Sequence, residues 1–322
     1  MTHRFSFANA LFHFARASGP GGFIWKYALT YLAGVTLMAG LAYFLFQPLI
    51  KVAFDTALRA AQGLIAGEEV EIILTREVTG MVGRIAFSWI LLIILGVLFW
   101  VVFEAAIHRR YVREEGFRLS LGGDELRLLL VGLLWFVFFI ISYLLSLILA
   151  GILIAIFVTI GDGETFFLGL GFPAVFLVTG LAWAYVAVRL SPASALTVRD
   201  RRVHFFHAWG ASRGRVLPLF FAYAILAVAF WFIFTIAYSA GAAALVATLM
   251  SNFNDIDQME ANPAEVLMFF LKAEFLAPAI GTYVVLLMLQ GLFFYVWAGP
   301  AGLAAKTDPR GGGTAQAPDV FA

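Results

Sequence analysis

Six long apolar stretches constrain this chain more than any other feature of its sequence. Each is long enough for a membrane-spanning helix, which needs about 20 apolar residues, and together they cover residues 23–49, 85–107, 128–160, 166–188, 216–250 and 275–305. A transmembrane β-barrel would instead show segments of about ten residues with alternating polarity. The chain is 62% hydrophobic, above the roughly half that is usual for soluble domains. We predict an all-α, polytopic transmembrane helical bundle of six spans, one domain over 1–305 followed by a disordered cytoplasmic tail over 306–322.

Basic residues are distributed unevenly between the loops that these spans imply. Most of the 21 Lys and Arg lie in the N-terminal segment, in the loops after the second and fourth spans, and in the tail. Two of the opposite loops are acidic, with GDGE at 161–164 and NDIDQME at 254–260. The positive-inside rule then places both termini in the cytoplasm. We expect a multi-pass protein of the bacterial inner (plasma) membrane.

Each odd-numbered span follows a cytoplasmic segment that combines apolar and basic positions. These segments are FSFANALFHFARASGPGG, REEGFRLSLGGDELRLL and RRVHFFHAWGASRGRVLP. Apolar and basic faces together are typical of an amphipathic helix lying in the headgroup layer, and a small-residue break follows in each case. The pattern favours a threefold helix-hairpin repeat, in which each copy is a surface helix, a span, an outer loop and a second span.

A family resemblance is carried by two cytoplasmic loops, RRYVREEGFRLSLGGDELRLL and VRLSPASALTVRDRRVHFFHAWGASRGRV. The run Arg-Leu-Ser-Pro-Ala at 189–193, the AW pair and the Ser-Arg-Gly-Arg run within 208–215 resemble the membrane domain of some bacterial glycerophosphodiester phosphodiesterases. That domain is similar to free-standing inner-membrane proteins of unassigned function. The catalytic barrel of those phosphodiesterases has no counterpart here, so the resemblance implies the membrane part alone and carries no enzymatic activity.

Clustered arginines mark candidate contacts with lipid headgroups or with a partner protein. They flank the second span and the third surface segment: Arg109, Arg110, Arg113, Arg199, Arg201 and Arg202. Basic clusters at the cytoplasmic surface attract anionic lipids, at about 1 kcal/mol for each residue. The same arginines could serve only as topology determinants, and the two roles are compatible.

Glu104 is the one acidic residue within a predicted span, about one turn from its cytoplasmic end. An ionisable group in a membrane usually has a partner, and Arg189 lies at the matching depth of the fourth span. The pair is either a proton or substrate relay or a structural ion pair that fixes two helices.

No pattern of residues indicates a metal, a cofactor or a catalytic centre. His204 and His207 have the spacing of half a metal site but lack a third ligand nearby. Asp255, Asp257 and Glu260 lack the glycine and the closing glutamate of a calcium loop. The chain has no GxSxG, HExxH or phosphate-binding glycine loop. We therefore expect a protein without cofactor, without enzymatic activity and without a nucleic-acid partner.

Small residues at four-residue spacing predict where helices approach closely. The pairs and triplets are Gly151/Ala155, Ser239/Ala243/Ala247 and Ala277/Gly281.

Two functions fit these patterns. The first is a non-enzymatic membrane protein whose basic surface helices engage anionic lipid or a partner protein, a second copy of the chain included, in support of envelope organisation. The second is a transporter or permease-like protein for a lipidic or small solute, with Glu104 and Arg189 as its gate pair.

Overall fold

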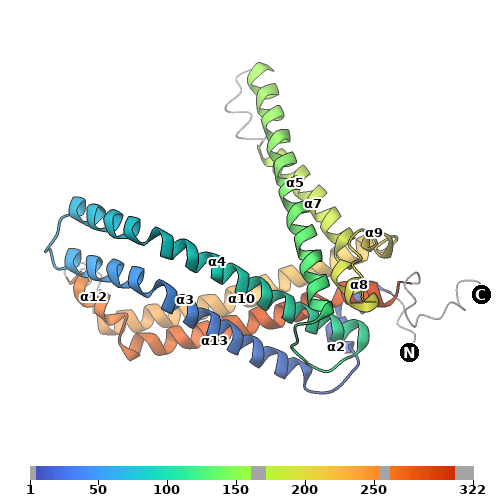
Figure 1. Ribbon diagram of the computed structural model, residues 1–322, viewed down its shortest axis with the longest axis horizontal. Coiled ribbons are helices and arrows are strands. Elements are labelled where there is room, and N and C mark those ends of the chain that lie inside the picture. Colours follow the sequence, from blue (N-terminus) through green and yellow to red (C-terminus); the bar gives the residue numbers. More distant parts are fainter. Residues whose placement is uncertain (1–4, 161–171, 254–261, 309–322) are drawn as a thin grey trace, which may run out of the picture. The chain divides into compact units, whose positions relative to one another are not determined.

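The computed structural model describes residues 5–160, 172–253 and 262–308. Within these ranges the chain is helical, without any strand, and six helices are long and apolar enough to cross a membrane. They are α3 (Phe23–Ala61), α4 (Gly67–Arg113), α5 (Gly123–Ile160), α7 (Phe172–Leu190), α10 (Val216–Asn252) and α13 (Ala273–Trp297) (Figure 1). The prediction of an all-α polytopic bundle is confirmed.

Shorter helices lie between or beside these spans. They are α1 (Phe7–Leu11), α2 (His13–Arg16), α8 (Ala193–Asp200), α9 (Ala208–Ala211), α12 (Pro263–Phe269) and α14 (Gly299–Lys306). Prolines begin three of these helices: Pro192 is the N-cap residue of α8, and Pro263 and Pro300 stand in the first turns of α12 and α14. Proline is tolerated there because a first-turn N–H has no partner within its own helix.

The chain divides into two compact units. Unit 1 comprises Met1–Gly21, Val101–Ala227 and Tyr295–Ala322, and unit 2 comprises Gly22–Trp100 and Val228–Phe294. Three of the long helices, α4, α10 and α13, contribute residues to both units. Unit 1 contains nearly all the charged residues that the sequence singles out.

Unit 2 is a bundle of long helix segments that approach each other at glycines. A Cβ added at Gly34 of α3 would meet the ring of Phe99 of α4, and one at Gly291 of α13 would lie 2.7 Å from the ring of Tyr31. A Cβ at Gly241 of α10 would meet the side chain of Thr282 of α13. Small residues allow such close backbone approach in membrane helices, where packing replaces the hydrophobic effect as the driving force.

Gly151 and Gly281, which the small-residue spacing predicted at close helix contacts, do not lie at such contacts within the part of the chain that the structure describes. A Cβ added at Gly151 or at Gly281 would meet no atom of the described residues within 4 Å. Spacing along one helix does not say which face meets a neighbour, because α5 and α13 are apolar on all sides.

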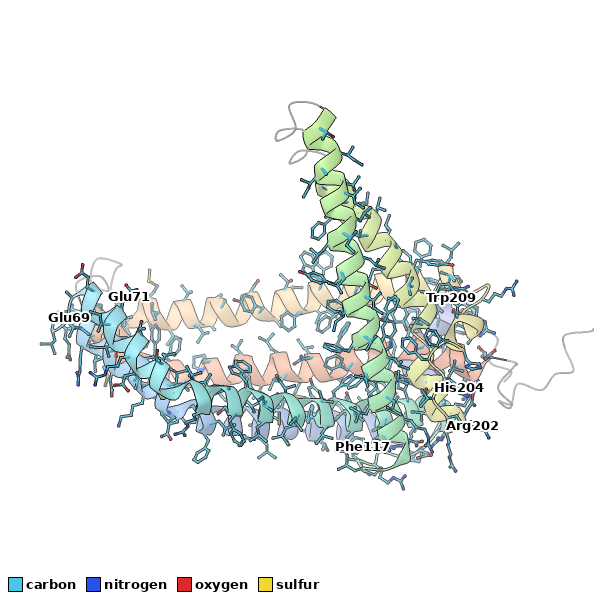
Figure 2. All side chains as sticks on the ribbon, turned by 45° about the horizontal axis from the view of Figure 1, so that its top comes forward. Glu69, Glu71, Phe117, Arg202, His204 and Trp209 are labelled. Carbon is cyan, nitrogen blue, oxygen red and sulfur yellow. The ribbon has the colours of Figure 1, made fainter. Side chains whose placement is uncertain are left out.

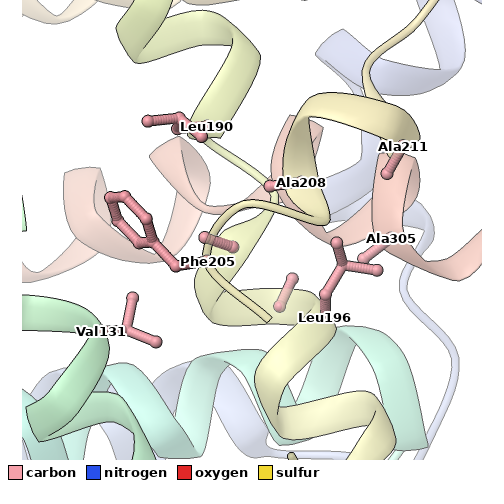
Figure 3. Close-up of a cluster of buried hydrophobic side chains, with 9 residues drawn as sticks. Val131, Leu190, Leu196, Phe205, Ala208, Ala211 and Ala305 are labelled. Atoms are coloured by element: carbon pink, nitrogen blue, oxygen red, sulfur yellow. The ribbon is translucent and has the colours of Figure 1, made fainter. Parts of the chain in front are cut away.

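The core of unit 1 is formed by two short helices of small residues, α8 and α14. They contact each other closely, and α8 also contacts α5 while α14 contacts α1. Every residue from Ala193 to Val198 and from Gly299 to Ala305 is buried. Figure 3 shows one apolar cluster at this junction, in which Leu196 and Ala305 are joined by Val131, Leu190 and Phe205. Both short helices therefore lie largely inside unit 1, and the segment predicted to lie on the surface, 201–218, begins just after α8.

The surface helix predicted before the third span does not form. Residues 114–121 are non-helical, and helix α5 begins only at Gly123. In this segment a side chain, and not a helical N–H, bonds a backbone carbonyl: Arg109 Nη2 donates to the carbonyl of Arg118 at 3.0 Å. The Glu125 carboxylate accepts from the N–H of Gly122 at 3.0 Å and so caps α5.

Residues 306–308, which the prediction assigned to the tail, belong to the packed part of unit 1. Lys306 ends α14, and Asp308 is buried. Residues 309–322, the acidic stretch 161–164 and the acidic residues Asp255, Asp257 and Glu260 lie outside the described residues.

Candidate functional site

The three arginines at the end of α4 point into unit 1. The Arg109 guanidinium lies 2.6 Å from the Glu125 carboxylate, and both side chains are almost completely buried. Arg113 pairs with Asp124 at 2.7 Å and also donates to the carbonyl of Val198. These bonds join the end of α4 to the first turn of α5 and to α8.

Arg110 joins the same helix to the N-terminal segment. Its guanidinium donates to the carbonyl of Pro20 at 3.1 Å and to that of Ala17 at 3.4 Å. Arg199 pairs with Asp200 at 2.7 Å and donates to the carbonyl of Ala305, at the end of α14. Guanidinium groups are suited to such sites because their five donors can satisfy several acceptors at once. Four of the six candidate headgroup arginines therefore bond to protein groups inside unit 1.

Arg201 and Arg202 are placed differently. Both are exposed, immediately after α8, where Arg201 turns the chain in a left-handed conformation with φ of 55°. Exposed apolar side chains come next in the same segment, and Phe206 is 75% exposed. We define the α8–α10 surface as Arg201, Arg202, Val203, Phe206, Trp209, Arg213 and Leu217. Figure 2 labels Arg202 and Trp209 at the two sides of this segment.

Glu104 and Arg189 are not brought together. The Glu104 carboxylate lies 3.5 Å from Nε2 of His108, one turn along α4. The Arg189 guanidinium instead lies over the Trp209 ring, 4.5 Å from its centroid, and forms no ion pair with a described carboxylate. The predicted intramembrane pair is therefore absent from the described part of the chain. The prediction paired the two residues because they lie at matching depths in their spans, but α9 places the Trp209 ring over the arginine instead.

Sequence reasoning missed two further features of unit 1, and the first is Arg215, which holds the end of α14 in place. Arg215 donates to the carbonyl of Ala304 at 3.1 Å and to the carbonyl and hydroxyl of Thr307 at 2.9 Å each. Burial lowers the pKa of this guanidinium, and the nearby Asp308 opposes that shift. Arginine interacts favourably with the free carbonyls and negative dipole at a helix C-terminus. The basic residue just before a span was the only sequence signal for this contact.

A tyrosine pair is the second missed feature. The Tyr111 hydroxyl donates to the carbonyl of Tyr295 at 2.6 Å, and the two rings stack with centroids 5.1 Å apart. Tyr295 donates in turn to the carbonyl of Phe14 at 3.1 Å. These bonds join α4, α13 and α2 within unit 1.

His204 gives this part of unit 1 an expected acid sensitivity. Burial lowers its pKa, while Asp200, whose carboxylate lies 3.4 Å from Nε2, raises it; His207, Arg199 and Arg202 lower it further. A histidine with a lowered folded pKa stabilises the fold while neutral, and this contribution declines as the pH falls below its unfolded value of about 6.5.

We therefore expect the melting temperature of the purified protein to fall between pH 7.5 and pH 5.5. The H204N variant should show a smaller fall over the same interval, because asparagine does not titrate. An increase in the melting temperature of the wild type on acidification would show that Asp200 outweighs burial.

Comparison with family models, with curated proteins and with solved structures gives no match to this chain. The resemblance to the phosphodiesterase membrane domain therefore stays a prediction.

Proposed function

We propose that this chain is a non-enzymatic protein of the bacterial inner membrane, with both termini in the cytoplasm, that engages anionic lipid through the α8–α10 surface. The observation that carries the proposal is that Arg201, Arg202 and Arg213 are exposed within the same short segment as the exposed side chains of Val203, Phe206 and Trp209. Basic and apolar side chains together suit the headgroup layer, where the charges meet phosphates and the rings enter the acyl boundary. Envelope organisation is the role that such lipid engagement would support.

Burial narrows the proposal to a subset of the candidate arginines. Arg109, Arg110, Arg113 and Arg199 use their donors on carboxylates and carbonyls of unit 1. We assign these four to the stability of unit 1 and reserve headgroup binding for Arg201, Arg202 and Arg213.

Transport receives no comparable support. The gate pair on which that alternative depended, Glu104 with Arg189, does not form among the described residues. The same exposed surface could instead bind a partner protein, and the lipid-binding experiment below distinguishes the two cases.

Replacing Arg201 and Arg202 with Gln should weaken the binding of phosphatidylglycerol to the delipidated protein. At about 1 kcal/mol for each arginine, we expect affinity at this surface to fall about 30-fold. Native mass spectrometry of a lipid titration at low salt measures the distribution of bound lipids. Because the groups are exposed, raising the salt concentration should weaken binding to the wild type in the same way.

Two control variants accompany this test. R201K/R202K keeps the charges and should bind as the wild type does. K51Q/R59Q removes two exposed basic residues of α3 in unit 2 and should leave the α8–α10 surface unaffected. Equal binding by R201Q/R202Q and the wild type would refute the proposal, and retention of a protein in place of lipid would replace it with a scaffold role.

A further inference from the structure

One arginine of unit 1 is held by aromatic rings rather than by acceptors. Arg189 stands in the last turn of α7, with its guanidinium carbon 4.5 Å from the Trp209 centroid and 5.9 Å from the Tyr185 centroid. Cations within about 6 Å of a ring face are attracted by the ring quadrupole. We call these three residues the Arg189 clamp.

The Arg189 clamp is a built structure, not a chance surface contact. The buried hydroxyl of Ser212 donates to the carbonyl of Arg189 at 2.9 Å, which fixes the end of α9 against the end of α7. The rings of Tyr185 and Trp209 meet edge to face, with centroids 5.9 Å apart. The guanidinium is therefore held in one place by two helices.

The N–H groups of Arg189 lack the protein acceptors that five other arginines of unit 1 have within the described residues. Arg109, Arg110, Arg113, Arg199 and Arg215 each donate to carbonyls or carboxylates of unit 1. The Arg189 side chain makes no hydrogen bond or ion pair with any residue of 5–160, 172–253 or 262–308, and its Nε is buried without an acceptor. Ring faces attract a cation but offer no lone pairs to its in-plane N–H groups. A buried, charged donor in this position is costly unless an oxygen acceptor completes it.

The position of the clamp indicates which acceptor is available. Arg189 stands in the last turn of the long apolar helix α7, and Tyr185 and Trp209 are both substantially exposed. Tyrosine and tryptophan are enriched at the level of lipid headgroups. Phosphate oxygens lie at that level, and the planar guanidinium fork matches a phosphate better than an ammonium group does.

We propose that the Arg189 clamp binds the phosphodiester group of a single anionic phospholipid, with the Arg189 N–H groups on its oxygens and the Trp209 ring beside its glycerol and upper acyl chains. The ligand class rests on the proposed function, but the site does not include Arg201 or Arg202. It differs from the α8–α10 surface in stoichiometry: one lipid is retained in a fixed geometry, whereas the surface gathers several by charge.

The test uses the full-length protein, delipidated in a nonionic detergent and titrated with dioleoylphosphatidylglycerol. We expect one lipid to bind more tightly than the rest in native mass spectra and to raise the melting temperature. R189Q should weaken this first binding step about tenfold to hundredfold, the range expected for lost hydrogen bonds to a charged group. R189K should lie between the two, because it keeps the charge and loses the fork. Dioleoylglycerol, which has the same chains and no phosphate, should not compete.

Several outcomes would overturn the proposal. A first binding step that R189Q leaves unchanged would do so, as would equal competition by dioleoylglycerol. Inorganic phosphate that stabilises the wild type as strongly as the lipid would show a site for free phosphate instead. R189Q should melt as the wild type does without lipid, since it breaks no hydrogen bond or ion pair within the described chain. If R189Q does not fold, Y185L removes the clamp ring that does not belong to the α8–α10 surface and should weaken the first step as well.

The two lipid proposals can fail separately. R201Q/R202Q should keep the first, tight lipid and lose the later, salt-sensitive ones, whereas R189Q should do the reverse. If R201Q/R202Q lost both the tight lipid and the salt-sensitive lipids while R189Q lost neither, the lipid-binding surface would be retained and the Arg189 clamp refuted.

Discussion

Replacing Arg109 with Met is expected to lower the free energy of unfolding by about 3–5 kcal/mol, the cost of breaking a buried ion pair from one side. Its guanidinium lies 2.6 Å from the Glu125 carboxylate, and the two side chains are 3% and 4% exposed. Within the described part of the chain, the substitution leaves the buried carboxylate with the N–H of Gly122 and the hydroxyl of Ser120 as its donors. It also removes the donor to the Arg118 carbonyl, which holds the non-helical segment before α5.

The measurement is a denaturant titration of the purified protein, compared with E125L and with the double variant R109M/E125L. R109M leaves the buried Glu125 carboxylate without its cation, and E125L leaves Arg109 with longer carboxylate contacts, to Asp124 at 3.9 Å and to Glu115 at 4.0 Å. The double variant removes both members of the pair, so it should be clearly less destabilised than the sum of the two. R118Q is the matched control. Its exposed side chain is lost, but its carbonyl still accepts from Arg109, and we expect a change within about 0.5 kcal/mol. Simple additivity of R109M and E125L would contradict a direct coupling between the two side chains.

Adding a single methyl group at Gly302 should destabilise unit 1 by about 1–3 kcal/mol, as expected for overpacking. A Cβ there would lie 2.7 Å from Cβ of Tyr111 and 3.0 Å from its Cγ, which is closer than real side chains approach. Tyr111 has no room to move, because it is buried, stacked on Tyr295 and hydrogen-bonded to the Tyr295 carbonyl. This destabilisation is opposite in sign to the effect of helix propensity, because alanine is more favourable than glycine within a helix by about 1 kcal/mol.

Gly281 provides the control for this prediction. It lies within α13, and a Cβ there would meet no described atom within 4 Å. G281A should therefore be neutral or stabilising, while G302A lowers the melting temperature and G302V lowers it further. A G302A variant as stable as G281A would mean that α14 can shift away from Tyr111 at little cost.

The sequence shows where the arginines of unit 1 are concentrated, but it does not show which of them point into the protein. The density of arginine after the second span stands apart from the apolar spans in the sequence as it does in the structure. Which arginines of the two basic loops face inward depends on acceptors far away in the chain: Pro20 for Arg110, Val198 for Arg113 and Ala305 for Arg199. The sequence around an arginine does not contain its distant acceptor, so no pattern within a loop shows which arginines are buried.

The sequence by itself determined that this chain is an all-α, multi-pass membrane protein with six spans. Length and hydropathy suffice for that, because a backbone in hydrocarbon must satisfy its own hydrogen bonds and an uninterrupted helix does so within each segment. Only the tertiary structure decided which groups meet between segments. It buried α8 and α14, separated Glu104 from Arg189, and set the Arg189 guanidinium against Trp209. The physical reason is that these contacts join residues distant in sequence, where periodicity and local charge carry no information about the partner.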